Sequence, residues 1–206
     1  EDYLQTEWPE LDVYLTSVTD HYSTASICGP NSKKILKKIF PDKDFSDDAF
    51  PHMSYQNGKI DEINCRIMRI SFTGELSYEI NIESKYGKSL WEKCIEAGKE
   101  FKITPYGTET MHLLRAEKGF IIVGQDTDGT MTPIDLQMDW IVSKKKYDFI
   151  GKRSLYRSDT IREDRKQLVG LLTDDPNEVL EEGAQIVSDM SKKPIEMIGH
   201  VTSSYF

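Results

Sequence analysis

The stretch from Arg69 to Ile82 holds the residues whose types and spacing best suit ligand chemistry. Two strand-like runs flank a corner made of Thr73, Gly74 and Glu75. Glycine permits backbone conformations that other residues avoid, and a carboxylate fixed in such a turn can bind a ligand. The alternative is a β-turn whose acid faces water, which is the ordinary state of a turn acid. The corner is therefore a candidate binding site, and the rest of the chain must decide between these interpretations.

Arg115 is a second candidate, because it lies in a helix predicted over residues 108–118. Helical spacing places Arg115 on the same partly apolar face as Met111. A guanidinium on such a face needs an anion or a carbonyl group, since an unpaired buried charge is very costly. The partner is either a ligand or a structural carboxylate, for which Glu75 and Glu117 are candidates.

The loop from Asp126 to Thr130 reads DTDGT, which is similar to the nucleophile motif of haloacid-dehalogenase-like phosphatases. In this chain Gly124 and Gln125 separate the loop from the strand-like run 120–123, and the motif falls in the middle of the chain. A calcium loop would need an acid at the twelfth position from Asp126, which is Gln137. We therefore interpret the loop as a turn rich in Asp and Gly.

Other common catalytic and metal-binding patterns are missing from the sequence. The histidines lie far apart, at His21, His52, His112 and His200. No HxxxH or HExxH pair occurs, so a zinc site is not indicated. No GxSxG elbow and no glycine-rich phosphate loop occurs, which argues against a serine hydrolase and against nucleotide binding.

The composition narrows the class of protein. The chain has 206 residues and a formal net charge of −9, which disfavours nucleic-acid binding because phosphate contacts need clustered Lys and Arg. No apolar run reaches the roughly 20 residues of a membrane helix, and no signal peptide is visible, so no membrane contact is expected. Cys28, Cys65 and Cys94 are widely spaced and form no CxxC motif, which predicts free thiols and a cytoplasmic location.

The ends of the sequence suggest a piece of a longer protein. The first residue is Glu1 rather than Met, and the last residues, 199–206, still have strand-like composition. We therefore expect further protein on both sides.

Hydrophobic periodicity and turn residues predict a mixed α+β fold with an all-β tail. The predicted helices span residues 31–40, 86–101, 108–118, 133–140 and 151–157. The predicted strands span residues 13–19, 23–28, 53–56, 59–72, 77–82, 120–123, 167–173, 185–187 and 195–201. Asn57-Gly58 is a strong signal for a tight hairpin turn.

Four segments, in this order, resemble the aminomethyltransferase (glycine-cleavage T-protein) superfamily: SFTGELSYEI, PYGTETMHLLRAEKG, GQDTDGTMTP and the terminal GHVTSSYF. Within that superfamily these segments most resemble the C-terminal folate-binding region of heterotetrameric sarcosine oxidase alpha subunits. The resemblance covers nearly the whole chain.

The resemblance implies three folate-binding residues. T-proteins usually read GYTGEDGxEI at the corner, and the Glu of their TGE, which is Glu75 here, binds the pterin. A carboxylate can accept two N–H bonds from an aminopyrimidine edge. Their helix reads GARDxLRxEAG; its second Arg is Arg115 here, whereas its first Arg is replaced by Met111, so that contact cannot be carried over. Tyr78 replaces a small residue and is either a ring-stacking wall or plain packing. The family's catalytic Asp lies upstream, so no catalytic residue is expected in this chain.

The resemblance also implies a three-lobed fold around a folate channel. Residues 1–52 would be the tail of a ferredoxin-like lobe, residues 53–165 the central α+β folate-binding lobe, and residues 166–206 the start of a truncated C-terminal β-barrel lobe.

The implied activity is oxidative demethylation of sarcosine, with transfer of the one-carbon unit to tetrahydrofolate. The products would be glycine and 5,10-methylenetetrahydrofolate. FAD, FMN and NAD would belong to the full heterotetramer with its beta, gamma and delta subunits, not to this segment, which alone should be inactive. The alternatives are a dimethylglycine oxidase or aminomethyltransferase of the same fold, and a non-enzymatic folate-binding scaffold.

Overall fold

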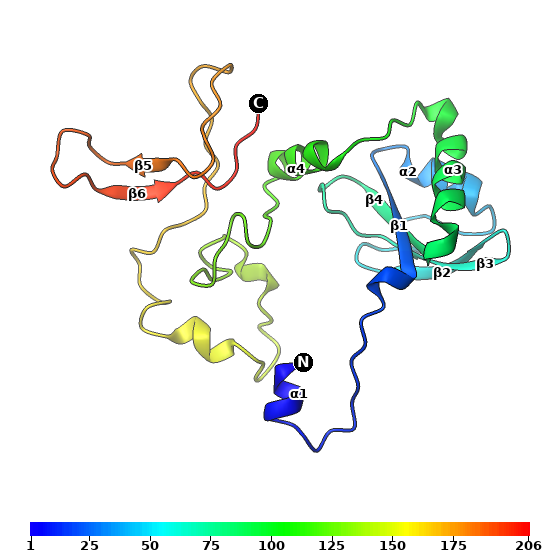
Figure 1. The fold of residues 1–206 in the computed structure, drawn as a ribbon, viewed down its shortest axis with the longest axis horizontal. Coiled ribbons are helices and arrows are strands. Elements are labelled where there is room, and N and C mark those ends of the chain that lie inside the picture. Colours follow the sequence, from blue (N-terminus) through cyan, green and yellow to red (C-terminus); the bar gives the residue numbers. More distant parts are fainter. The chain divides into compact units, whose positions relative to one another are not determined.

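The computed structural model describes residues 1–206 and shows a mixed α+β chain (Figure 1). The α+β class predicted from the sequence is confirmed. The chain divides into two units, residues 1–111 and 112–206, and each is described by itself. No helix is long and apolar enough to cross a membrane.

The first unit is built on a four-stranded antiparallel sheet with the order β1-β4-β3-β2. Its strands are β1 (Tyr22–Cys28), β4 (Ser77–Glu83), β3 (Ile63–Met68) and β2 (Tyr55–Ile60). The first helix along the chain is the short α1 (Asp2–Thr6), which is followed by α2 (Ser32–Ile39) and α3 (Gly87–Gly98). Helix α4 (Thr108–Glu117) crosses the boundary to the second unit.

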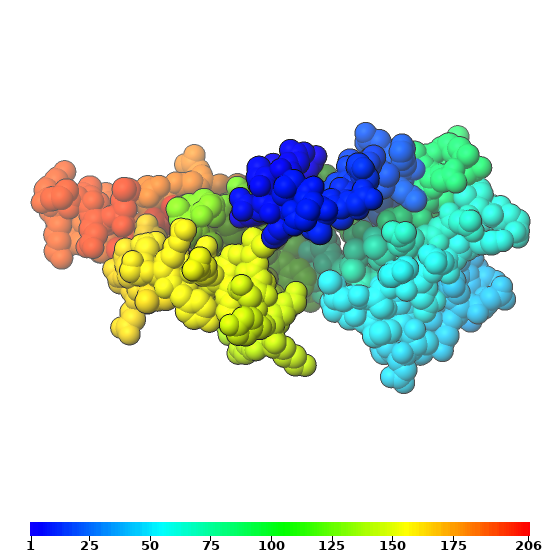
Figure 2. All heavy atoms as spheres, turned by 90° about the horizontal axis from the view of Figure 1, so that it is seen from below, coloured from blue at the N-terminus to red at the C-terminus, as the bar shows by residue number.

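One face of the sheet carries the core. Alternation along β4 buries Tyr78, Ile80 and Ile82, which belong to one apolar cluster with Leu36 of α2 and Leu90 of α3. Helix α3 packs on both β1 and α2. In Figure 2 the atoms coloured from light blue to cyan, which include α2, β2 and β3, form one packed body. The apolar periodicity therefore fixes which side of β4 faces the helices and which side is left for polar residues.

The predicted hairpin turn at Asn57-Gly58 was wrong. Both residues lie inside β2, and the turn to β3 is formed by Asp61 and Glu62, with φ of 47° and 65°. A Cβ at Gly58 would come within 3.1 Å of the Phe40 ring, so glycine suits close packing there rather than a turn.

The three longer helices confirm the sequence predictions within a few residues. Asn31 holds the N-cap position of α2, although its side chain makes no capping hydrogen bond. Helix α3 continues into a 3₁₀ turn at Lys99–Phe101. Helix α4 ends before Gly119, whose φ of 72° is the left-handed conformation typical of a helix stop.

The second unit contains little regular structure beyond α4. Its two-stranded sheet pairs β5 (Gln185–Val187) with β6 (Met197–His200), and no closed barrel forms. The predicted helix 133–140 is absent, and Asp139–Ile141 forms a 3₁₀ turn instead. The predicted strands 13–19, 120–123 and 167–173 are not formed, because a strand needs a neighbour to pair with and none of these segments has one in residues 1–206. The lobe boundaries proposed at 52 and 165 stay predictions.

Candidate functional site

The corner lies in the connection between β3 and β4, and its backbone shows why the sequence has glycine there. Gly74 adopts a φ of 76°, a region that other residues enter only with strain. Arg69 fixes the start of the connection: its guanidinium donates to the Phe50 carbonyl at 2.6 Å and pairs with Asp47 at 2.7 Å. Glu75 follows directly on Gly74 and is partly exposed. The connection therefore presents a carboxylate on a turn that glycine adopts without strain and that is anchored at its base.

Glu79 is a second carboxylate in this region, and the sequence analysis missed it. It lies on the face of β4 opposite Tyr78 and Ile80, with Ser26 and Met68 as its cross-strand partners. It is half-buried, and burial raises the pKa of its carboxyl above the ordinary value. Strict alternation through SYEINI could have placed this acid on the sheet face without helices. We refer to residues 71–79, which hold the corner and both carboxylates, as the corner segment.

Tyr78 is fully buried rather than presented to a ligand. Its ring packs edge-on against Phe45, with 6.0 Å between ring centroids, and against Phe50 at 5.6 Å. Burial raises the pKa of its hydroxyl. Of the two roles left open by the sequence, packing is the one that these contacts describe.

Arg115 is 2% exposed and lies at the centre of a buried polar group that we call the Arg115 cluster. The members of this cluster are Arg115, Asp126, Thr202, Ser203 and Tyr205. The Arg115 guanidinium pairs with the Asp126 carboxylate and donates to the Ser203 hydroxyl at 2.7 Å and the Tyr205 hydroxyl at 3.0 Å. The carboxylate partner is thus Asp126, which the sequence analysis had assigned only to a turn.

Asp126 is satisfied at both of its oxygen atoms. One accepts hydrogen bonds from Thr202 at 2.7 Å and Ser203 at 2.6 Å, and the other accepts from the Ile122 N–H at 2.8 Å as well as from Arg115. Burial by itself would raise the pKa of Asp126, but these hydrogen bonds and the guanidinium outweigh it and hold the pKa below its usual value. The cluster therefore ties α4, the loop after it and the C-terminal residues together with an ionised pair.

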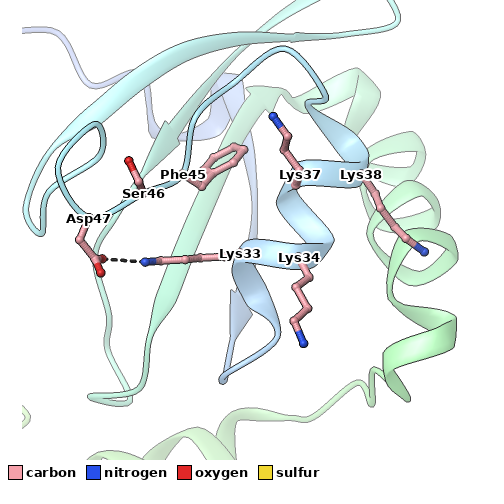
Figure 3. Close-up of a pocket in the computed structure, with 7 residues that line it drawn as sticks. All are labelled: Lys33, Lys34, Lys37, Lys38, Phe45, Ser46 and Asp47. Carbon is pink, nitrogen blue, oxygen red and sulfur yellow. Dashed lines mark hydrogen bonds and ion pairs between the residues drawn. The ribbon is translucent and has the colours of Figure 1, made fainter.

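A surface pocket of about 600 Å³ lies beside α2, away in sequence from the predicted site residues (Figure 3). Its lining residues are Lys33, Lys34, Lys37, Lys38, Phe45, Ser46 and Asp47. Figure 3 shows Lys33 pointing toward Asp47, to which it donates at 2.7 Å. Lys38 is paired with Glu100, and Lys37 donates to the Lys43 carbonyl. Much of the basic charge of this helix is thus already engaged within the chain.

Metal and thiol chemistry find no support in residues 1–206. No three His, Cys, Asp or Glu side chains are close enough together to hold a metal ion. All three cysteines are free, and burial raises the pKa of both the Cys65 and the Cys94 thiol to about 11. These thiols are therefore protonated at neutral pH and are poor nucleophiles.

The sequence of this chain is similar to a known domain family and to several characterised proteins. A family model described as the GCVT N-terminal domain matches residues 1–146. The sarcosine oxidase subunit alpha of Corynebacterium sp. (strain P-1) is 56% identical over 209 residues, which cover 100% of this chain and 22% of that protein.

More distant relatives have other names. An aminomethyltransferase of Thermoanaerobacter pseudethanolicus (strain ATCC 33223 / 39E) is 33% identical over 95% of this chain and 50% of that protein. The mitochondrial dimethylglycine dehydrogenase of Mus musculus is 30% identical over 95% of this chain and 22% of that protein. The chain spans about a fifth of the length of the sarcosine oxidase alpha subunits that it matches.

Proposed function

Because this chain belongs to the GCVT N-terminal domain family, we propose that it is the folate-binding part of a sarcosine oxidase alpha subunit. The observation that carries the proposal is the 56% identity to such a subunit over the whole chain, well above the 33% and 30% to the aminomethyltransferase and the dimethylglycine dehydrogenase. In the whole protein, sarcosine would be oxidised at a flavin held outside residues 1–206. Tetrahydrofolate would accept the one-carbon unit, giving glycine and 5,10-methylenetetrahydrofolate.

The corner segment has the chemistry to hold a folate. Glu75 is the carboxylate that we expect to accept N–H bonds from the pterin, because two parallel bonds to one carboxylate match an aminopyrimidine edge. Glu79 is the second candidate for this role, because its half-buried carboxylate has no hydrogen bond or ion pair within the chain. An acid kept in such surroundings gains more from a cationic or N–H-rich ligand than an exposed acid does.

Arg115 and Tyr78 receive supporting roles in this proposal. Both terminal nitrogens of Arg115 are already engaged by Asp126, Ser203 and Tyr205. Tyr78 is enclosed by phenylalanine rings. We therefore expect each residue to stabilise its own part of the chain rather than to contact the folate.

The remaining parts of the proposal concern the whole protein. Further subunits, with FAD, FMN and NAD bound outside this segment, would complete the oxidase. The free cysteines fit a reducing cytoplasm. Positioning of the folate nitrogens beside the oxidised carbon would be the contribution of this chain to the reaction.

The test is calorimetric titration of the intact protein with tetrahydrofolate, in parallel for wild type, Glu75→Gln and Glu79→Gln. We expect the variant that lacks the pterin-binding carboxylate to bind roughly tenfold to a hundredfold more weakly, as expected for loss of a charge-assisted hydrogen bond. Glu83→Gln is the matched control, because Glu83 is exposed at the end of β4 and pairs only with Lys85. Wild-type affinity in both Glu75→Gln and Glu79→Gln would refute the role of the corner segment. Turnover of sarcosine against dimethylglycine separates the proposed oxidase from its relative.

A further inference from the structure

Buried polar atoms without partners are concentrated in the corner segment. Four buried side-chain atoms of the chain lack a hydrogen bond: Ser71 Oγ, Thr73 Oγ1, Tyr78 Oη and Arg115 Nε. Three of the four belong to residues 71–78. Buried polar groups of folded proteins are almost always paired, and an unpaired one costs about 1–3 kcal/mol. Unpaired buried polar atoms, which destabilise a fold, are thus concentrated in one short stretch of the chain.

Thr73 is the clearest of the three. It is 3% exposed, and the other fully buried serines and threonines are paired within the chain: Ser32 with the Leu76 carbonyl, Ser77 with Ser26, and Thr132 with Asp135. The Ser71 hydroxyl is also buried and unpaired, but Ser71 as a residue is only half-buried. The hydroxyl of Tyr78 belongs to a ring on the helix-covered face of the sheet, so it is a separate case. Thr73 is thus the one buried aliphatic hydroxyl of the corner itself that is left without a partner.

Thr73 lies two residues before the proposed pterin carboxylate, Glu75. Thr73 and Glu75 are separated only by Gly74, so their Cα atoms are at most about 7.6 Å apart. This spacing is short enough for one small heterocycle to contact both residues. A carboxylate can only accept hydrogen bonds, whereas a hydroxyl can both donate and accept. An aminopyrimidinone edge presents N–H donors next to a carbonyl acceptor, and the carboxylate cannot serve the acceptor.

We infer that Thr73 is a ligand-binding residue whose hydroxyl donates a hydrogen bond to an acceptor atom of the folate bound at the corner. This inference rests on the proposed function and adds a residue to its site. It explains why the hydroxyl is kept buried and unpaired in the chain, because a partner supplied by the ligand satisfies it. It also assigns complementary roles to two neighbouring residues, with Thr73 donating and the carboxylate accepting.

The experiment replaces Thr73 by Val, which keeps the branched shape and removes the hydroxyl. A buried hydroxyl with no partner can be replaced by an apolar group of the same shape at little or no cost. Thr73→Val should therefore keep or raise the melting temperature of the ligand-free protein. Its affinity for tetrahydrofolate, titrated in the intact subunit, should fall roughly three- to tenfold, which corresponds to one net hydrogen bond. Thr73→Ser retains the hydroxyl and should bind as wild type does.

Thr132→Val is the matched control, because Thr132 is also buried but its hydroxyl is paired with Asp135. It should lower the melting temperature and leave folate affinity unchanged. A Thr73→Val protein that loses thermal stability with unchanged affinity would overturn the inference while leaving the proposed function intact. Equal losses of affinity in Thr73→Val and Thr73→Ser would also overturn it, since the cause would be packing. If wild type binds no tetrahydrofolate, the proposed function fails, and the inference fails with it.

Discussion

The corner segment and the Arg115 cluster both bury polar side chains, but these side chains are paired in the cluster and largely unpaired in the corner segment. In the cluster every polar atom except Arg115 Nε has a partner within the chain, and the Asp126 carboxylate accepts four hydrogen bonds. In the corner segment, Ser71 and Thr73 keep unpaired hydroxyls and the Glu79 carboxylate has no partner. A satisfied network stabilises a fold, whereas an unsatisfied one leaves hydrogen bonds to be made with a ligand. The comparison supports a structural role for the cluster and is the basis on which we propose binding at the corner segment.

The largest effect should come from breaking the cluster. Asp126→Ala would leave the Arg115 guanidinium buried without its counter-ion, and we expect a loss of about 3–5 kcal/mol in the free energy of unfolding. Urea denaturation measures this loss. Asp164→Ala is the control: it removes an exposed partner of Arg162 and should cost less than about 1 kcal/mol. Similar losses in the two variants would contradict a structural role for the cluster.

The double variant Arg115→Met with Asp126→Leu tests whether the unpaired charge is the cause of that loss. Replacing both members of a buried ion pair by apolar residues removes the unpaired charge. It should therefore be more stable than Asp126→Ala. If it is less stable, the surrounding hydroxyls of Ser203 and Tyr205 contribute more than the ion pair itself.

A smaller effect is expected at the corner. Gly74→Ala places a side chain at a φ of 76° and should cost about 1–2 kcal/mol. Because the strain is next to Glu75, the variant should also weaken tetrahydrofolate binding. Gly170→Ala is the control, since a side chain there would meet open space at an ordinary φ. A Gly74→Ala protein with unchanged stability would show that the turn adapts easily, which would weaken the case for a preorganised corner.

The smallest effect concerns the pH dependence of Glu79. Burial raises the pKa of Glu79 in the folded state, so the folded protein binds this proton more tightly than the unfolded chain does. The carboxyl therefore favours folding most at a pH below its unfolded pKa, and this contribution is lost as the pH rises through the folded pKa. Glu79→Gln should raise the melting temperature at pH 7 and give no gain at pH 4. A gain that is independent of pH would show that the carboxylate is not the cause.

Some elements of this fold could be predicted from the sequence, and others could not. Helices α2, α3 and α4 and strand β4 followed from apolar spacing and capping residues, because each pattern is local. The turn predicted at Asn57-Gly58 was wrong, because Gly58 lies in a strand where the Phe40 ring, from another part of the chain, packs closely against it. The segment 167–173 has strand composition, yet Leu172 is 99% exposed and no strand pairs with it. A strand forms only when another strand pairs with it, and a segment's own residues do not show whether such a partner exists.

The sequence by itself determined the α+β class, the family and the glycine-dependent corner, because composition, spacing and turn chemistry act over a few residues. Only the tertiary structure decided what each polar side chain meets. Asp126 and Ser203 are 77 residues apart, and nothing in either local sequence predicts that both contact Arg115. The same holds for Thr73, whose hydroxyl is recognisable as unpaired only once its surroundings are known. Burial and pairing depend on the packed chain, and at this corner they identify the unpaired polar groups on which the proposed binding site rests.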